Sequence, residues 1–382
     1  MTYPTISHFI EKATGIFIPL PIQTFGFFIV TAFIIAHFFI KKEFIRLEKN
    51  NKINTVSFTK NKNNYNILYD YIFNGLLSFL FGFKIIYIIK NYELFSQYPQ
   101  QVLLSKDGNI LLGFIFFTIS NILIYYSDKQ NEKTKKTKDI LPSSLSWNFI
   151  FIAGLSGIIG AKLFAVLEDF NYLITNPIDA IFSFSGLTFY GGLIFGTISV
   201  ILYAKKYKIK ITYLADIFAP SLILAYGVGR LGCHFSGDGD WGIIANMDKK
   251  PIFLPDWFWG YDFPHNVIEA GQKIDGCIGM YCNKLPYLVY PTALYEACFG
   301  ILAFIFLYKI RKFIKIPGML FCLYLILNGT ERFLIEIIRI TDKYTVFGMN
   351  FTQAQIIGIL LIIIGISGSL YLKQKNNELI QE

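Results

Sequence analysis

Arg230 is an ionisable residue at the end of an apolar segment. It stands in the stretch YGVGRLGCHFSGDGDWG, which joins that segment to a loop rich in glycine and aspartate. The GxGR part is not a phosphate loop of the Walker type, because the Lys-Ser/Thr pair is missing. A guanidinium nevertheless presents a planar fork of donors that suits a phosphate, and its charge survives burial. This residue type at this position therefore indicates anion binding near a helix end.

A second set of charged residues lies in the far half of another apolar run, FCLYLILNGTERFLIEIIR. Tyr324, Asn328, Arg332, Glu336 and Arg339 recur at intervals of four or three residues, which predicts one helix face. With a rise of about 1.5 Å per residue, Arg332 should lie on the order of 10 Å below the outer helix end. Ionisable groups at that depth usually face a bundle interior or a wet cavity. The structural alternatives are an internal Arg332–Glu336 ion pair and an Arg339 that only extends to the membrane interface.

Two further runs contain weaker candidates. Tyr190, Gly191 and Gly192 open one run in the stretch FYGGLIFG, where glycines at this spacing are equally typical of a close helix contact. Lys162 is a cation in another run and is more typical of a pairing or interface-seeking residue than of a catalyst. The convergence of cations from different runs at one depth favours a functional site over these separate structural interpretations.

The composition places these residues in a membrane. Of the 382 residues, 54% are hydrophobic, 18% aromatic and only 16% charged, which is far more apolar than a soluble domain of this length. The net charge of +9 does not indicate nucleic-acid binding, because the lysines fall in short stretches between apolar runs. No cleavable signal peptide is expected, since the first ten residues lack a cationic start and a small-residue cleavage site.

About nine apolar runs reach the length of roughly twenty residues that spans a membrane. Lipid offers no hydrogen-bond partners to the backbone, so each run should be a helix. The fold expected is an all-α, polytopic membrane helix bundle. The runs are approximately Phe25–Ile40, Tyr71–Ile89, Ile110–Tyr126, Trp147–Val166, Leu187–Ala204, Tyr213–Leu231, Pro291–Ile310, Met319–Ile338 and Phe351–Leu372.

The loops between the runs alternate in charge, which predicts the orientation. Lysine and arginine cluster after the first, third, fifth and seventh runs, whereas the intervening loops are poorer in lysine and often acidic. By the positive-inside rule the basic loops are cytoplasmic, so the N-terminus is outside and the C-terminus is cytoplasmic. The charged groups singled out above then lie toward the extracytoplasmic side.

Several short stretches give the sequence a family resemblance. In order they are QTFGFFIVTAFI, GIIGAKLF, SGLTFYGGLIFG, ADIFAPSLILAYGVGRLGCHFSGDGDWG, YPTALYEACFG, NGTERFLIEIIR and TQAQIIGILL. Their order and spacing resemble the prolipoprotein diacylglyceryl transferases. These integral membrane enzymes move a diacylglyceryl group from phosphatidylglycerol to a lipoprotein-signal cysteine. The resemblance covers the first run and most of the chain from about Gly154 to Leu372.

The family core has seven spans, so the resemblance implies an insertion. We expect an N-terminal segment with the first span at 1–49 and an inserted segment at 50–139 with two extra spans and a basic cytoplasmic loop. The main transferase-like membrane domain should occupy 140–372, with an extracytoplasmic loop at 232–289. Residues 373–382 should form a cytoplasmic tail.

The resemblance also implies roles for single residues. Arg230 corresponds to the signature arginine, Gly242 closes the signature loop, and Arg332 and Glu336 are the paired charges of the penultimate helix. The chain departs from the family pattern at several positions, and the signature loop is about one residue longer than usual. Tyr190 stands where the family has the histidine proposed as its base. Cys233 replaces an asparagine and Asn328 replaces a tyrosine. The tryptophan-tyrosine pair that the family has near Thr24-Phe25 is absent.

Transfer to a thiol sets two chemical tasks. The thiol, with an ordinary pKa near 8.5, must lose its proton, and the departing glycerol phosphate gains charge as its bond breaks. Arg230 and Arg332 suit the second task by electrostatic stabilisation in a water-poor site. The candidates for the first task are His234, Asp238, Glu336 and Tyr190. An imidazole has the most suitable ordinary pKa, although a histidine after a helix end is more often a loop hydrogen-bonder.

The predicted site has a catalytic set and a substrate-binding set. The catalytic set is Arg230, Arg332, Glu336, Tyr190 and His234, and the substrate-binding set is Arg230, Gly191, Gly192, Asp238, Gly242, Asn328 and Arg339. No metal or cofactor is expected, because the four histidines are scattered and the cysteines lack ligand spacing. Cys277 and Cys282 lie close together in the outer loop, which permits a disulfide there but leaves its geometry open.

The partners implied are phosphatidylglycerol and prolipoprotein signal peptides with a lipobox cysteine, in a multi-pass protein of the bacterial inner membrane. A non-catalytic paralogue that only binds phospholipid would keep the same signature, and the missing histidine leaves this alternative open. A flippase or transporter is the third class. It would need an alternating-access path, but the sequence has no repeated block and no broken helices in matching halves.

Overall fold

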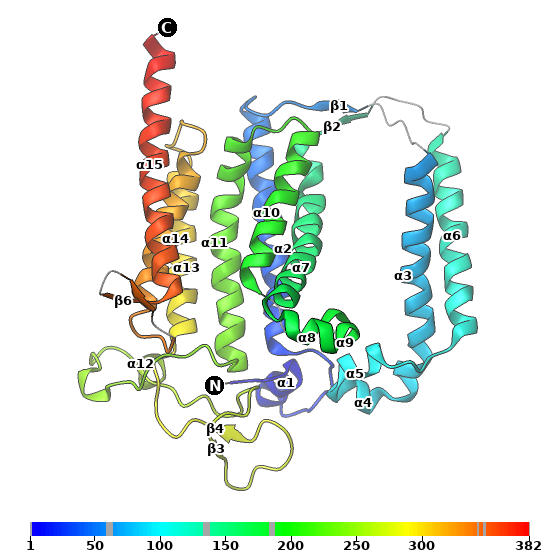
Figure 1. Cartoon of the computed structure of the whole chain (residues 1–382), viewed down its shortest axis with the longest axis vertical. Helices are drawn as coiled ribbons and strands as arrows, with labels where there is room; N and C mark the ends of the chain where they lie inside the picture. Colours follow the sequence, from blue (N-terminus) through cyan, green and yellow to red (C-terminus); the bar gives the residue numbers. More distant parts are fainter. Residues whose placement is uncertain are drawn as a thin grey trace. The chain divides into compact units, whose positions relative to one another are not determined.

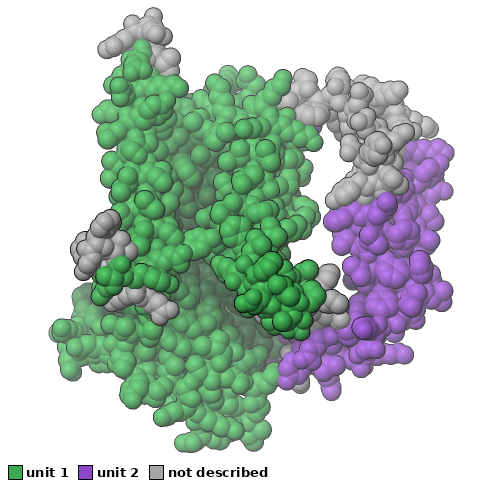
Figure 2. Space-filling view, viewed as in Figure 1, with its two compact units in different colours: residues 1–16, 23–54, 142–382 green, residues 17–22, 55–141 purple. Residues whose placement is uncertain are grey.

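The computed structural model describes residues 2–58, 64–132, 138–182, 188–341, 344–346 and 349–381. These residues are mainly helical (Figure 1). They divide into two compact units, coloured separately in Figure 2. The first comprises Met1–Ile16, Gln23–Asn54 and Pro142–Glu382, and the second comprises Phe17–Ile22 and Thr55–Leu141.

Among the described residues, the first unit contains most of the helices and two short pairs of strands. Its long helices are α2 (Thr24–Lys49), α7 (Ser146–Glu168), α10 (Phe189–Lys206), α11 (Ile211–Ser236), α13 (Thr292–Ile310), α14 (Met319–Ile335) and α15 (Gln353–Gln381). Its short elements are α1 (Ile6–Thr14), α8 (Phe170–Thr175), α9 (Pro177–Phe182), α12 (Asp256–Trp259), β3 (Gln272–Lys273), β4 (Asn283–Lys284), β5 (Tyr344–Val346) and β6 (Met349–Phe351).

The second unit is a helical hairpin. Its elements are β1 (Val56–Phe58), α3 (Asn64–Lys90), α4 (Tyr92–Gln97), α5 (Pro99–Leu104), α6 (Ile110–Glu132) and β2 (Lys138–Ile140). Strand β1 precedes α3 in the chain, strand β2 follows α6, and the two strands pair antiparallel. The buried Lys84 of α3 donates to the carbonyls of Val102 at 3.0 Å and Asp107 at 2.9 Å, which ties α3 to the segment before α6.

Each of the nine predicted apolar runs contains a helix, as expected for backbone that lipid cannot hydrogen-bond. Among the described residues, six helices are long and apolar enough to cross a membrane, namely those at Thr24–Lys49, Tyr71–Lys90, Pro142–Glu168, Ile211–Ser236, Thr292–Ile310 and Gln353–Glu378. The chain is therefore a multi-pass membrane protein with a mainly helical fold. The count of nine spans and the orientation stay predictions.

Helix α11 forms the centre of the first unit. It packs against α2 and α13, and Ile223 and Leu307 are almost fully buried in the core cluster that these helices share. Gly227 and Gly300 let α11 and α13 approach closely, since a Cβ on Gly300 would lie 2.9 Å from the Gly227 Cα. Small residues at such a crossing are typical of membrane helix pairs.

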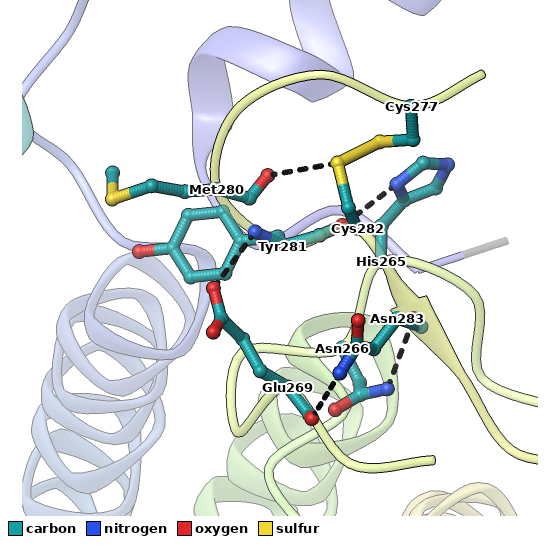
Figure 3. Close-up of a disulfide and its surroundings, with 8 residues drawn as sticks. All are labelled: His265, Asn266, Glu269, Cys277, Met280, Tyr281, Cys282 and Asn283. Carbon is teal, nitrogen blue, oxygen red and sulfur yellow. Dashed lines mark hydrogen bonds between the residues drawn. A yellow bond between two sulfur atoms is a disulfide. The ribbon is translucent and has the colours of Figure 1, made fainter. Parts of the chain in front are cut away.

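The long loop after α11 lies at one end of this unit. In Figure 1 the N-terminus, α1 and the loop with α12, β3 and β4 lie at that end, and the C-terminus of α15 lies at the opposite end. The disulfide that the sequence permits is present between Cys277 and Cys282 in this loop, next to the β3–β4 pair (Figure 3). Glu269 accepts a hydrogen bond from the Tyr281 amide at 3.1 Å and helps to close the loop around the disulfide.

Helix α14 is shorter than predicted, which changes the placement of the charged residues near its end. The helix ends at Ile335, so Glu336 is its C-cap and Arg339 lies beyond it. Arg332 is thus three residues from the helix end, about 5 Å by the helical rise, and its depth in the membrane stays a prediction. The prediction of one continuous face from Tyr324 to Arg339 is wrong in its last part. Beyond the helix the backbone turns and pairs with another segment, as Arg339 forms an antiparallel bridge with Gly242.

Candidate active site

Arg230 lies in the last two turns of α11 and points at an acidic residue of α13. Its side chain is only 11% exposed and forms an ion pair with Glu296, whose side chain is fully buried. The guanidinium also contacts the Sγ of Cys233 at 3.4 Å. A buried charge is costly unless it is paired and hydrogen-bonded, so Arg230 and Glu296 depend on each other.

Glu296 is shared by three arginines from separate parts of the chain. Besides Arg230, Arg332 of α14 donates from Nη1 to Glu296 Oε1 at 3.2 Å, and Arg339 Nη1 lies 3.9 Å from the same oxygen. The helix crossings of α13 with α11 and α14 bring these side chains together. Glu296 is therefore the centre of a network that we call the arginine cluster: Arg230, Glu296, Arg332, Arg339 and Asp240.

Tyr226 and Glu331 extend the arginine cluster toward the interior. The Tyr226 hydroxyl lies 3.1 Å from Glu296 Oε1 and 3.2 Å from Glu331 Oε1. Tyr226 precedes Arg230 by one helical turn, so both side chains lie on the same face of α11. A phenol has one proton and can donate to only one of the two carboxylates at a time.

Asp240 completes the arginine cluster from the loop after α11. One carboxylate oxygen is paired with Arg230 Nη1 and the other with Arg339 Nη2. The backbone around it is anchored, because Thr292 Oγ1 donates to the Asp240 carbonyl at 3.0 Å and the Asp240 amide donates to Asp238 Oδ1 at 3.2 Å. The loop thus presents one carboxylate to two guanidinium groups.

Gly242 explains how the loop and the segment after α14 meet. Its amide donates to the Tyr290 carbonyl at 2.8 Å, and the Ile243 amide donates to the Ile338 carbonyl at 2.8 Å. A Cβ at position 242 would lie 2.6 Å from the Ile338 carbonyl oxygen. A larger residue would separate the two backbones and move Arg339 away from Asp240.

The arginine cluster pairs three guanidinium groups directly with two carboxylates, those of Glu296 and Asp240. The carboxyl groups of Glu331 and Glu336 also lie near enough to interact with Arg332. Burial opposes the ionisation of Asp240, but Arg230 and Arg339 outweigh it and lower the pKa of its carboxyl. Arg332 is the most exposed of the three arginines, with 30% of its side chain accessible. It is therefore the guanidinium that an incoming anion can reach most easily.

Comparison with known proteins identifies the family of the chain. A family model with the description Prolipoprotein diacylglyceryl transferase matches residues 110–371, which is most of the chain. The chain belongs to the prolipoprotein diacylglyceryl transferase family. It is 33% identical over 231 residues to the phosphatidylglycerol--prolipoprotein diacylglyceryl transferases of Staphylococcus aureus strains MSSA476 and Newman. The matched part is 60% of this chain and 75% of each relative.

The prolipoprotein diacylglyceryl transferase match begins at residue 110, inside the segment 50–139 that the sequence predicts to be inserted. The structure places Thr55–Leu141 in the second compact unit together with Phe17–Ile22. That this unit is an insertion relative to the family stays a prediction.

The family resemblance implied a pair between Arg332 and Glu336, and here the structure differs. Arg332 pairs with Glu296 on the neighbouring helix, at 3.2 Å. Glu336 is 2% exposed, and its Oε2 has no hydrogen-bond partner among the described residues. Glu336, the C-cap of α14, still has helical dihedrals, so the helical spacing to Arg332 is kept and it is the crossing of α13 and α14 that brings Arg332 to Glu296.

Cys233, Asp238 and Asp240 each offer a ligand atom, and these atoms lie within 4.8 Å of one another. The sequence predicts no metal site in this member of the prolipoprotein diacylglyceryl transferase family. Asp240 already has two guanidinium partners, which supply the positive charge that a cation would otherwise provide. The grouping is thus explained without a metal.

His234 lies one turn after Arg230 and is packed among aromatic rings. Its ring centroid is 5.7 Å from that of Tyr261 and 5.6 Å from that of Phe263. Its Nδ1 has no hydrogen-bond partner within the part of the chain that the structure describes. Burial raises the pKa of Tyr261 to about 12, so this neighbour is a neutral phenol. A catalytic role for His234 stays a prediction.

Tyr190, Gly191 and Gly192 lie at the start of α10. A Cβ on Gly191 would lie 2.3 Å from the carbonyl oxygen of Gly160 in α7, so the two helices cross in near contact there. This supports the packing interpretation of the glycine pair. Tyr190 is 37% exposed and forms no hydrogen bond with the arginine cluster among the described residues. Substrate contacts by these three residues stay predictions.

Asn328 lies on α14 one turn before Arg332 and is partly buried, so the structure leaves its predicted contact with substrate as a prediction. Sequence reasoning missed Glu296, Glu331, Tyr226 and Asp240 as members of the site. A signal existed for Glu296, because it is an acidic residue inside the apolar run Pro291–Ile310. Intramembrane carboxylates are expensive and default to a functional or pairing role.

Proposed function

We propose that this chain transfers a diacylglyceryl group from phosphatidylglycerol to the thiol of a prolipoprotein cysteine. Two substrates follow from the printed names of its relatives, a phosphatidylglycerol and a prolipoprotein. The finer parts of the proposal are a lipobox as the recognised peptide, the outer face of the membrane as the place of reaction, and the bacterial inner membrane as the location.

The observation that carries the proposal is the set of three arginines around the buried Glu296. Arg230 and Arg332 would hold the phosphate of the lipid head group, because guanidinium forks match phosphate oxygens. Glu296 would position them, since it receives both guanidinium groups and is fully buried. A fixed anchor of this kind keeps donors aimed where charge develops and so lowers the cost of reorganisation.

In the reaction the thiol loses its proton and its sulfur attacks the glyceryl carbon that bears the phosphate. A carbon–sulfur bond forms and the carbon–oxygen bond breaks, and the oxygen keeps the electron pair as glycerol phosphate departs. The departing phosphate gains negative charge, which the arginine cluster would stabilise. The substrate-binding candidates beyond the arginines remain Gly191, Gly192, Asp238, Gly242 and Asn328.

The proton acceptor has four candidates, namely His234, Asp238, Glu336 and Tyr190. His234 is packed among aromatic rings, so it would receive the proton in a buried environment. Asp238 is partly exposed and would receive the proton closer to solvent. A neutral phenol with an ordinary pKa near 10 is a poor base, so Tyr190 would serve better as a donor to a phosphate or ester oxygen.

The decisive experiment incubates the purified protein with phosphatidylglycerol and a lipobox peptide. A thioether product that forms over many turnovers supports the proposal. If the lipid binds and protects the protein but no product forms, the chain is a binding paralogue. If the lipid moves across the membrane but no product forms, the chain is a flippase. A peptide with serine in place of the lipobox cysteine is the matched control, because it lacks the attacking thiol.

A further inference from the structure

The Asp240 carboxylate occupies two guanidinium groups in the manner of a small anion. Its two oxygens are divided between Arg230 and Arg339, one to each. A phosphodiester also presents two non-bridging oxygens, and each can accept a charge-assisted hydrogen bond from a guanidinium. The internal carboxylate therefore holds donors of Arg230 and Arg339 that an incoming phosphate would use together with those of Arg332.

The two carboxylates of the arginine cluster differ in accessibility. Glu296 has a fully buried side chain, whereas 31% of the Asp240 side chain is exposed. Glu296 also has the Tyr226 hydroxyl at 3.1 Å as a neutral partner. Asp240 is thus the partner that can leave the arginines and regain water, while Glu296 stays.

The backbone around Asp240 favours a movement of its side chain alone. The Asp240 carbonyl accepts from Thr292, and the neighbouring Gly242 is tied to Tyr290 and bridges Arg339. Rotation about the Cα–Cβ bond of an aspartate moves its carboxylate from one staggered well to another, so the carboxylate can turn outward while the loop remains in place.

We propose that Asp240 is an internal substitute for the lipid phosphate, which holds Arg230 and Arg339 in the lipid-free protein and is displaced when a phosphate binds. This inference rests on the proposed function in naming the lipid as the incoming anion. The ligand chemistry is that of a phosphate group with two free oxygens, either within a phospholipid head group or as a free phosphate ester.

Displacement lowers the apparent affinity for phosphate, because only molecules with released arginines can bind. In return, the phosphate binds at a site whose donors are already arranged for two oxygens. In the lipid-free protein, Asp240 keeps the arginines from being unpaired inside the helix bundle. Asp240 is accordingly a positioning and specificity residue.

The first test compares Asp240→Asn with Asp248→Asn, a control on an exposed residue of the same loop. Affinity is measured by titrating the protein in nanodiscs with phosphatidylglycerol and, separately, by titrating detergent-solubilised protein with glycerol phosphate. Asp240→Asn should bind phosphatidylglycerol about tenfold more tightly and Asp248→Asn should match the unaltered protein. Unchanged or weaker binding by a folded Asp240→Asn protein would overturn the inference.

The two titrations distinguish the source of the phosphate. A gain with phosphatidylglycerol alone supports a lipid head group as the displacing anion, and an equal gain with glycerol phosphate supports the phosphate group by itself. Transfer to the lipobox peptide is measured in parallel. A protein without transfer activity whose Asp240→Asn variant still binds lipid more tightly would refute the proposed function and support the displaceable carboxylate.

The second test uses the unaltered protein, so it does not depend on a variant that folds. Carboxyl groups are labelled with a carbodiimide and an amine, with and without phosphatidylglycerol, and the sites are read by mass spectrometry. Displacement predicts a several-fold rise in labelling at Asp240 and no change at Asp248. A purely electrostatic effect of Asp240 predicts no rise, and labelling that stays constant while lipid binds would overturn the inference.

Discussion

Two buried charge clusters lie at opposite ends of the first unit, and each is built on one glutamate. At one end Glu43 of α2 is paired with Arg46 at 2.9 Å and with Arg311 at 2.6 Å. At the other end Glu296 is the centre of the arginine cluster. Both glutamates are almost completely buried.

The difference lies in the carboxylates. At the Glu43 end a single carboxylate, 2% exposed, uses one oxygen for each arginine, and the Arg311 guanidinium also covers the ring of Tyr308 at 3.2 Å. The arginine cluster has a second carboxylate, that of Asp240, and 31% of its side chain is exposed. A buried ion pair alone does not identify a functional site, since it can serve only to hold helices together. A partly exposed and therefore exchangeable partner is what distinguishes the arginine cluster.

The orientation of the two clusters provides an all-or-none test. The lysine-rich loops predict that the Glu43 end lies in the cytoplasm and the arginine cluster outside. With native thiols replaced, a membrane-impermeant reagent should label Asp248→Cys and leave Lys312→Cys unlabelled in intact cells. Permeabilised cells, in which both should react, are the control. The reverse pattern would move the arginine cluster to the cytoplasmic face.

Substitution of one arginine in each cluster should separate catalysis from stability. Loss of one stabilising donor typically reduces turnover by about a hundredfold or more, so the turnover of Arg230→Ala should be steeply reduced. The turnover of Arg230→Lys should also be reduced, because this variant keeps the charge but loses the planar fork. Arg311→Ala should retain the turnover of the folded fraction. Transfer rates per folded molecule measure these effects. An Arg230→Ala variant with unimpaired transfer would contradict the proposal that Arg230 holds the phosphate.

The central glutamates should behave alike in stability and differently in activity. Breaking a buried ion pair by removing one partner costs about 3–5 kcal/mol, so Glu43→Gln and Glu296→Gln should both lower the melting temperature. Only Glu296→Gln should reduce turnover of the folded protein, because it releases Arg230 and Arg332. Thermal unfolding in the same detergent, paired with transfer assays, measures both effects. Equal turnover in the two variants would mean that Glu296 is only structural.

Tyr190 tests whether the proposed site extends beyond the arginine cluster to α10. A lost hydroxyl donor costs about 0.5–1.5 kcal/mol, so Tyr190→Phe should reduce turnover by about two- to tenfold. Tyr190→His restores the residue of the family pattern and should be tolerated. If both variants were inactive, the site would be built around the tyrosine, and the assignment of the proton to a group other than Tyr190 would be wrong.

The smallest effect is expected from the disulfide, which is remote from both clusters in the chain. Replacing Cys277 and Cys282 together by serine should destabilise the loop by about 2 kcal/mol, since the closed ring is short. Turnover should change by no more than about twofold, as for other substitutions away from a site. Mass spectrometry with and without reduction checks the bridge itself, and two free thiols in freshly isolated membranes would contradict it.

The helices could be predicted because lipid leaves the backbone no alternative partners. Runs such as Tyr213–Leu231 are apolar over spanning length, and α11 forms there as Ile211–Ser236. Arg230 could be singled out for the same local reason, because an ionisable side chain at such a helix end requires a partner. Neither conclusion needs information about the rest of the chain.

The partners of Arg230 were decided by tertiary structure. Glu296 is 66 positions away in the chain and becomes its partner because α11 and α13 cross closely at Gly227 and Gly300. Helical spacing predicted a pair between Arg332 and Glu336, whereas Arg332 is paired with Glu296 of the neighbouring helix α13. Periodicity reports only which residues share a face of one helix. Which charges meet across helices depends on crossing angles and on where each helix ends, and these are set by packing between segments that are distant in the chain.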